Sequence, residues 1–108
     1  MNITQLRYFC VLARHEHFGR AAEELHITQP SLSKTIHLLE NELGVYLFEK
    51  DGRGVRLTRQ GRRYFKYVSD GLASLDKGMD LLHKEKSLSY GYLDIGLISS
   101  IAYQEFPL

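Results

Sequence analysis

The sequence lacks the features that define several classes of protein. Its 108 residues contain one cysteine, two prolines and no tryptophan. Because Cys10 has no second cysteine, no internal disulfide can form, and this usage fits a reducing compartment. No apolar run approaches the roughly 18–20 residues that span a bilayer, and the first seven residues lack the basic-then-apolar layout of an export signal. We therefore expect a cytoplasmic chain with no membrane partner.

Catalytic and metal-binding patterns are equally scarce. The five histidines are scattered, and we find no Ser/His/Asp set, phosphate-cradling glycine loop or metal-ligand spacing. Cys10 lies on an apolar stripe, where a small core residue is a better interpretation than a nucleophile. The sequence predicts that the chain is not an enzyme and needs no cofactor or metal.

The net charge of +1 conceals an uneven distribution. Residues 1–66 contain eleven Lys and Arg against seven acids, a net +4, whereas the remaining residues contain three against six, a net −3. Between residues 50 and 66, seven cations accompany a single acid, Asp51. Such a local excess indicates a polyanion partner, although a solvated surface run has the same composition.

Apolar spacing predicts two short helices at the start of the chain. The first runs from Thr4, its expected N-cap, to His15, and its apolar residues recur at the i, i+3 and i+4 positions of one buried face. The second runs from Phe18 to Leu25, and alanines on its inner face allow another helix to approach closely.

A third helix is expected from about Pro30 to Leu43, with Thr28 or Gln29 as its cap and Gly44 as its stop. Its core stripe consists of four aliphatic residues: Leu32, Ile36, Leu39 and Leu43. The opposite face, which we call the polar face, carries short or donor-rich side chains: Ser33, Lys34, His37 and Asn41. A merely solvated face is usually dense in Glu and Lys, so this composition indicates a surface that recognises another molecule.

Two short strands are expected at residues 45–50 and 55–57, joined by a tight reversal in which two glycines flank Arg53. A two-stranded hairpin is marginal alone, so it must pack on the helices. The predicted fold is therefore mainly α: a winged helix-turn-helix of three helices and a two-stranded wing, followed by a long dimerising helix.

The long helix is expected from Arg59 to about Lys86. Six apolar residues alternate at spacings of three and four, which is the repeat of a coiled-coil seam: Phe65, Val68, Leu72, Leu75, Met79 and Leu82. At about 1.5 Å per residue the helix is roughly 40 Å long, more than the preceding domain can cover. We therefore expect most of the seam to pack on a second copy, the alternative being a helix that lies on its own domain.

The predicted organisation has three parts: a winged helix-turn-helix domain at 1–58, a linker and dimerisation helix at 59–87, and the start of a further domain at 88–108. The third part depends on residues 93, 95 and 97, whose apolar alternation is typical of a strand.

A composite sequence pattern covers roughly the first 66 residues. Its pieces are Leu6-Arg7-Tyr8-Phe9, the run from Ala21 to Lys34, Leu39-Glu40, Leu43-Gly44, Leu47-Phe48, and Arg53 to Thr58 with Gly61. In order and spacing, this resembles the LysR-type transcriptional regulators of bacteria. The resemblance implies a sequence-specific DNA-binding regulator that binds an interrupted inverted repeat as a homodimer, often as a tetramer when full length. It also implies that residues from 88 onward open an effector-binding domain, so a small-molecule effector would act only through a part missing from this chain.

The resemblance assigns DNA contact to the start of the third helix and to the wing. The matching positions are Gln29, Pro30, Ser31, Ser33 and Lys34, with Arg53 at the wing tip; His37 shares the polar face, and Arg56 begins the basic run expected along the flanking backbone. The chemistry agrees with these roles, since Gln pairs with adenine, Lys donates to guanine or phosphate, and an Arg between glycines can enter a narrow minor groove.

Three positions depart from the family pattern. His17 stands where Ser, a helix cap, is frequent. Lys34 and Lys50 stand where Arg is frequent, and at position 34 this changes the base contacts that the side chain can make. The alternative function is a coiled-coil dimerisation or adaptor module without DNA binding. That alternative accounts for the seam but not for the polar face or for the cations beyond Lys50.

Overall fold

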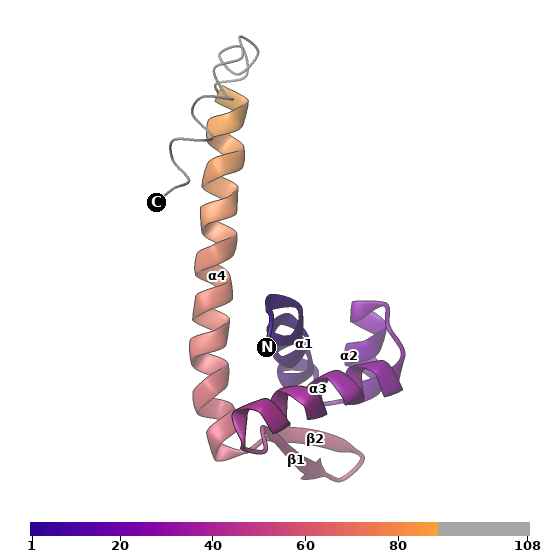
Figure 1. The fold of residues 1–108 in the computed structure, drawn as a ribbon. Helices are drawn as coiled ribbons and strands as arrows, with labels where there is room; N and C mark the ends of the chain where they lie inside the picture. Colours follow the sequence, from indigo (N-terminus) through magenta and orange to yellow (C-terminus); the bar gives the residue numbers. More distant parts are fainter. Residues whose placement is uncertain (89–108) are drawn as a thin grey trace. The chain divides into compact units, whose positions relative to one another are not determined.

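The computed structural model describes residues 1–88, which contain four helices and one hairpin (Figure 1). The elements are α1 (Ile3–His15), α2 (Phe18–Leu25), α3 (Gln29–Leu43), β1 (Phe48–Asp51), β2 (Gly54–Leu57) and α4 (Arg59–Leu88). This order confirms the predicted winged helix-turn-helix with a long helix after it. The strand predicted around residues 93–97 lies outside the described residues. Among the helices of residues 1–88, none is long and apolar enough to cross a membrane.

The start of α1 differs from the prediction. Asn2 caps this helix, because its side-chain oxygen accepts a hydrogen bond from the backbone N–H of Gln5 at 2.8 Å. The expectation that Thr4 is the cap is therefore wrong. Asn and Thr are both good caps, and sequence alone does not decide which of two neighbouring candidates adopts the extended backbone of the cap position.

Both ends of α3 are fixed by short-range contacts. The Oγ1 of Thr28 accepts a hydrogen bond from the N–H of Ser31 at 3.2 Å, which settles the choice between Thr28 and Gln29. Pro30 lies in the first turn, where its missing N–H costs nothing. Gly44 ends the helix with a φ of 76°, a left-handed conformation that glycine adopts without strain, as predicted.

The core of the first compact unit, Met1–Leu72, is centred on Phe9. The Phe9 ring is fully buried, and its centroid lies 5.6 Å from that of Phe48, 5.7 Å from that of Tyr64 and 6.2 Å from that of Phe65. One side chain thus joins α1 to β1 and to the first turns of α4. Cys10 beside it is also buried, and burial raises the pKa of its thiol, so this cysteine is a protonated core residue.

The six residues of the predicted seam have two different environments. Val68 and Leu72 are only 7% and 8% exposed and belong to the core of the first unit, against which Phe65 also packs. Leu75, Met79 and Leu82 are 49%, 53% and 64% exposed. The expectation that most of the seam needs a partner therefore applies only to its second half, and the first half packs on its own domain.

The wing is an antiparallel pair that runs from Phe48 opposite Leu57 to Asp51 opposite Gly54. Its first strand begins three residues later than predicted. The reason is the burial of Leu47, whose carbonyl accepts a hydrogen bond from the N–H of Thr58 at 2.9 Å, beyond the last pair of the ladder. The segment before the strand is therefore a core-packed connection rather than a strand.

Gly61, in the first turn of α4, lies directly against this connection. A Cβ atom built at residue 61 would overlap the carbonyl carbon and oxygen of Leu47. In contrast, a Cβ at Gly71 of the same helix meets no atom within 4 Å. Gly61 thus permits a close approach of two backbones, whereas Gly71 has no comparable packing requirement.

These two glycines give a matched pair of substitutions. Gly61→Ala should lower the free energy of unfolding by at least about 2 kcal/mol, because the clash is with backbone that cannot move aside. Gly71→Ala should raise it by up to about 1 kcal/mol, because alanine is the better helix former. Urea denaturation followed by circular dichroism measures both, and equal effects of the two substitutions would contradict the close approach.

Candidate nucleic-acid interface

The predicted contact residues lie on the exposed side of α3. Gln29, Pro30, Ser31, Lys34 and His37 are exposed, and Ser33 is half-buried. Leu32, Ile36 and Leu39 of the same helix are buried in the core. The division of this helix into an apolar inner face and a polar outer face is confirmed, and the outer face is available to a ligand.

A short turn holds α3 against α2. His26 ends α2 in the left-handed conformation with a φ of 58°, and its N–H donates to the carbonyls of Ala22 and Glu23. The N–H of Ile27 then donates to the carbonyl of Ala22 at 3.0 Å. Since Ala21 and Ala22 are buried, α2 can lie close to its neighbours. The turn leads into α3 (Figure 1), whose first residues, Gln29 and Pro30, are exposed.

His17 occupies the cap position of α2. Its Nδ1 accepts a hydrogen bond from the N–H of Arg20 at 3.1 Å. A Cβ at Gly19 would lie 2.9 Å from the Cε1 of His17 and 3.2 Å from the Nε2 of Gln29. The imidazole and the Gln29 amide therefore approach the same point, which is free because residue 19 has no side chain.

A shallow hollow of about 460 Å³ opens beside these side chains. Its lining comes from the start of α2 and the start of α3: Phe18, Gln29, Pro30 and Ser33. Three of the residues that the sequence analysis assigned to DNA contact, Gln29, Pro30 and Ser33, thus border a concave surface at the helix-turn-helix.

The wing is anchored to the turn between α1 and α2. Glu16 has a φ of 55°, and its carbonyl accepts a hydrogen bond from the N–H of Val55 at 3.1 Å. A Cβ at Gly54 would overlap this carbonyl oxygen, so glycine is required there. Gly52, with a φ of 62°, begins the two-residue loop, and the next residue, Arg53, is exposed at its tip as predicted.

Glu40 was not assigned a role from the sequence, yet it holds the connection between α3 and β1. Its side chain is only 7% exposed, and its Oε2 accepts hydrogen bonds from the N–H groups of Leu47 at 2.7 Å and Phe48 at 3.3 Å. In the sequence, the one indication was that Glu40 is adjacent to Leu39, a residue of the predicted apolar face, near the end of the helix. Such an acid is interpretable only once the fold shows which backbone groups lie opposite it.

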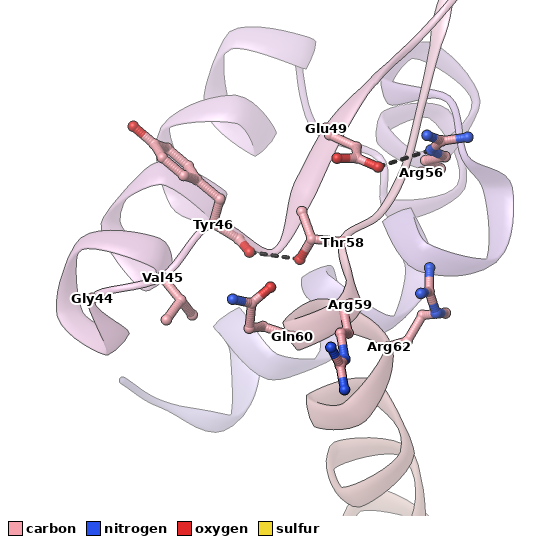
Figure 2. A pocket seen from close by; sticks show the side chains of 9 residues that line it. All are labelled: Gly44, Val45, Tyr46, Glu49, Arg56, Thr58, Arg59, Gln60 and Arg62. Carbon is pink, nitrogen blue, oxygen red and sulfur yellow. Dashed lines mark hydrogen bonds and ion pairs between the residues drawn. The ribbon is translucent and has the colours of Figure 1, made fainter.

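A second hollow, of about 840 Å³, lies where the base of the wing meets the start of α4 (Figure 2). We call it the basic hollow because three arginines line it: Arg56, Arg59 and Arg62. The other lining residues are Gly44, Val45, Tyr46, Glu49, Thr58 and Gln60. Its walls therefore carry most of the cations that the sequence placed just after the wing tip.

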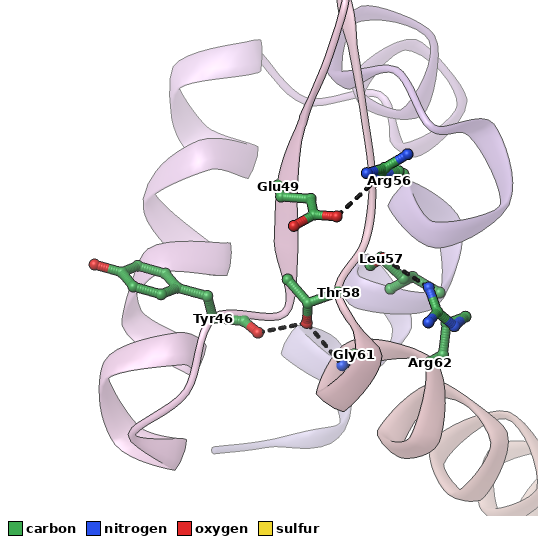
Figure 3. Close-up of polar contacts among 7 residues, drawn as sticks. All are labelled: Tyr46, Glu49, Arg56, Leu57, Thr58, Gly61 and Arg62. Carbon is green, nitrogen blue, oxygen red and sulfur yellow. Dashed lines mark hydrogen bonds and ion pairs between the residues drawn. The ribbon is translucent and has the colours of Figure 1, made fainter.

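Arg56 in this hollow is paired within the wing. Its Nε donates to Glu49 at 2.9 Å, directly across the ladder (Figure 3). The hydrogen bond and the charge of Glu49 raise the pKa of Arg56, which stays cationic. Arg62 donates through Nη1 to the carbonyl of Leu57 at 3.3 Å, whereas Arg59 has no partner within residues 1–88.

Thr58 lines the basic hollow and holds two of its neighbouring segments together. Its hydroxyl donates to the carbonyl of Tyr46 at 2.7 Å, and its Oγ1 accepts from the N–H of Gly61 at 2.9 Å (Figure 3). One side chain thus caps α4 and ties it to the connection before β1. Within residues 1–88, no group of His, Cys, Asp and Glu is arranged to hold a metal ion.

The role of Glu40 can be tested by its two simplest substitutions. Glu40→Ala should lower the free energy of unfolding by about 1–3 kcal/mol, because it leaves two N–H groups without an acceptor in a largely buried site. Glu40→Gln should cost less, because the amide oxygen can still accept. Chemical denaturation is the measurement, and Glu23→Ala on the exposed side of α2 is the control. A loss no greater than that of the control would contradict the role.

Comparisons with known proteins agree with this geometry. A family model described as "Bacterial regulatory helix-turn-helix protein, lysR family" matches residues 3–62. The HTH-type transcriptional regulator IlvR of Caulobacter vibrioides is 41% identical over 107 residues, which are 99% of this chain and 36% of IlvR. The RuBisCO operon transcriptional regulator of Allochromatium vinosum is 41% identical over 103 residues, 95% of this chain and 34% of that protein. The chain thus spans about a third of the length of these curated relatives.

Solved structures show the same fold. The DNA-binding domain of BenM in a complex with catB site 1 DNA superposes with a TM-score of 0.76 at 34% identity, covering 81% of this chain and 94% of that one. The CbnR DNA-binding domain in a DNA complex superposes with a TM-score of 0.72 at 30% identity, covering 79% of this chain and 98% of that one. With its winged helix-turn-helix and a family model that covers more than half of its residues, this chain belongs to the LysR family of bacterial regulatory helix-turn-helix proteins.

Proposed function

We propose that this chain is the DNA-binding part of a cytoplasmic bacterial transcriptional regulator. It binds the two halves of an interrupted inverted repeat in double-stranded DNA as a homodimer. The observation that carries this proposal is the polar outer face of α3, which begins at the surface with Gln29 and lies in one compact unit with an arginine-tipped wing. In helix-turn-helix proteins the second helix enters the major groove, and its first residues contact the base edges.

Each candidate residue has a role that its chemistry suits. Gln29 pairs with the N6 and N7 edge of adenine, and Lys34 and His37 donate to bases or phosphates deeper along the groove. Ser31 and Ser33 bind phosphates near the helix start, and Pro30 shapes that start. Arg53 enters the minor groove from the wing tip. Arg56 joins Arg59 and Arg62 along the flanking backbone.

Relatives support the same function. IlvR and the RuBisCO operon regulator are named as transcriptional regulators, and the BenM and CbnR domains have been solved with DNA. None of these names describes an enzyme, which supports a regulatory role without catalysis, cofactor or metal for this chain. An adaptor without DNA binding remains the alternative, but it assigns no role to the polar face or to the basic hollow.

The organisation of the chain follows from this function. Residues 1–58 read DNA, residues 59–87 join two copies, and residues 88–108 begin an effector-binding domain through which a small molecule would act on the longer protein. The exposed second half of the seam, Leu75, Met79 and Leu82, is the dimerisation surface proper. Phe65, Val68 and Leu72 support it from inside the first unit. The relative IlvR is about three times longer than this chain, which is consistent with such a further domain.

DNA recognition is tested by selecting bound duplexes from a random pool and measuring affinity by fluorescence anisotropy. Gln29→Ala should weaken binding to the selected site about 5- to 100-fold while changing random-duplex binding little, because it removes a base contact. Arg59→Ala should weaken both duplexes alike and make the salt dependence less steep, because it removes a phosphate contact. An equal loss on both duplexes for Gln29→Ala would remove its base-reading role. A wild-type chain that selects no sequence and binds no duplex at low salt would favour the adaptor.

Dimerisation is tested by a matched pair of double substitutions in α4. Leu75→Gln with Leu82→Gln should convert dimers to monomers in analytical ultracentrifugation, because both side chains are apolar and exposed in the single chain. Lys77→Gln with Lys84→Gln introduces the same residue on the opposite side of the heptad and should leave the dimer intact. Dimers in both variants would show that this seam is not the interface.

A further inference from the structure

We propose that His17 is a DNA-contacting residue that uses both of its ring nitrogens: Nδ1 caps α2, and the Nε2–H donates to a phosphate oxygen of the bound duplex. This inference rests on the proposed function, and it adds to the DNA contacts a residue that the sequence marked only as an unusual helix cap.

The first step is the tautomer of the ring. Because Nδ1 accepts a hydrogen bond from the N–H of Arg20 at 3.1 Å, Nδ1 carries no hydrogen. A neutral imidazole has one N–H, which must then be on Nε2. Within residues 1–88, no partner is present for this Nε2–H. The capping hydrogen bond thus leaves the Nε2–H of His17 as a donor without an acceptor in residues 1–88.

The second step is the position of the ring. His17 is half-buried, and its Cε1, the ring atom bonded to Nε2, approaches the same point beside Gly19 as the amide nitrogen of Gln29. Phe18, the next residue in the chain, lines the shallow hollow with Gln29, Pro30 and Ser33. The free donor therefore lies at the edge of the proposed DNA surface, next to the residue expected to read a base.

The third step is the choice of phosphate over a base edge. His17 precedes α2, the first helix of the helix-turn-helix, and in this motif the first helix crosses the backbone while the second enters the groove. Backbone contacts of this kind set the register of the protein on the duplex. A hydrogen bond from His17 would thus help to fix the position from which Gln29 reaches the adjacent base.

Two substitutions separate the cap from the DNA contact, because Asp and Asn are both strong N-caps. His17→Asn should keep the thermal midpoint near that of the wild type and weaken binding to the selected duplex several-fold. His17→Asp should also keep the fold, but it should bind about tenfold more weakly than His17→Asn, because a carboxylate then faces a phosphate. Asn2→Asp is the matched control, since it adds the same charge at the cap of α1 and should leave DNA affinity unchanged.

A phosphate scan identifies the contact. Selected duplexes carrying one neutral methylphosphonate at a time should show one position per half-site that weakens the wild type and has no effect on His17→Asn. Equal affinity of His17→Asp, Asn2→Asp and wild type, or a scan that is identical for His17→Asn and wild type, would overturn the inference and leave DNA binding intact. A wild-type chain that binds no duplex would instead overturn the proposed function, and this inference with it.

Discussion

The buried carboxylate of Glu40 is the contact on which the relation between α3 and the wing depends. By accepting the N–H groups of Leu47 and Phe48, it holds the connection from α3 to β1. Hydrogen bonds to a charged group contribute about 1.5–3 kcal/mol each. Because Leu47 is held, its carbonyl can receive Thr58, and the glycine at 61 brings α4 against it. Glu40 thus helps to hold in one frame the two elements that we propose to contact DNA.

The wing illustrates how a marginal element is stabilised by its attachments. A two-stranded ribbon alone has little stability, so the wing depends on its contacts with the rest of the domain. It is instead anchored at both ends of β2, through the Glu16 carbonyl to Val55 and through the Leu47 carbonyl to Thr58. Both attachments bring backbone against backbone, which is why glycines stand at 54 and 61. The apolar contact of Phe48 with Phe9 completes the anchoring from the core side.

Most of the helices and the order of elements were predictable, because the spacing of apolar residues and the residues that end a helix are local features of the sequence. The stripe of α3 from Leu32 to Leu39 is buried as its spacing required. The spacing of apolar residues predicts which face of a helix is buried, but it does not show which other element buries that face. The seam of α4 has one uninterrupted repeat, yet Val68 packs inside its own domain while Leu75 is half exposed. The role of Glu40 and the late start of β1 were unpredictable for the same reason, since both depend on backbone groups that only the fold brings together. The candidate site is a similar case: the predicted residues of α3 lie on its exposed side, but the pairing of Arg56 with Glu49 appears only in the structure.

In the proposed interface, the groups suited to sequence recognition and the groups suited to electrostatic attraction belong to different elements. The polar face of α3 contains one full charge, Lys34, so its contacts discriminate through hydrogen-bond geometry rather than through net attraction. The attraction resides in the wing and the basic hollow, where Arg56 and Arg62 are already oriented by Glu49 and by the Leu57 carbonyl. Pre-oriented cations lose less side-chain entropy on binding, which offsets the coulombic cost of sharing Arg56 with an acid. Residues beyond 66 are net negative, so the cations that would attract a polyanion are concentrated in the first 66 residues. A chain with a net charge of only +1 can therefore still carry a locally basic region suited to the DNA partner that we propose.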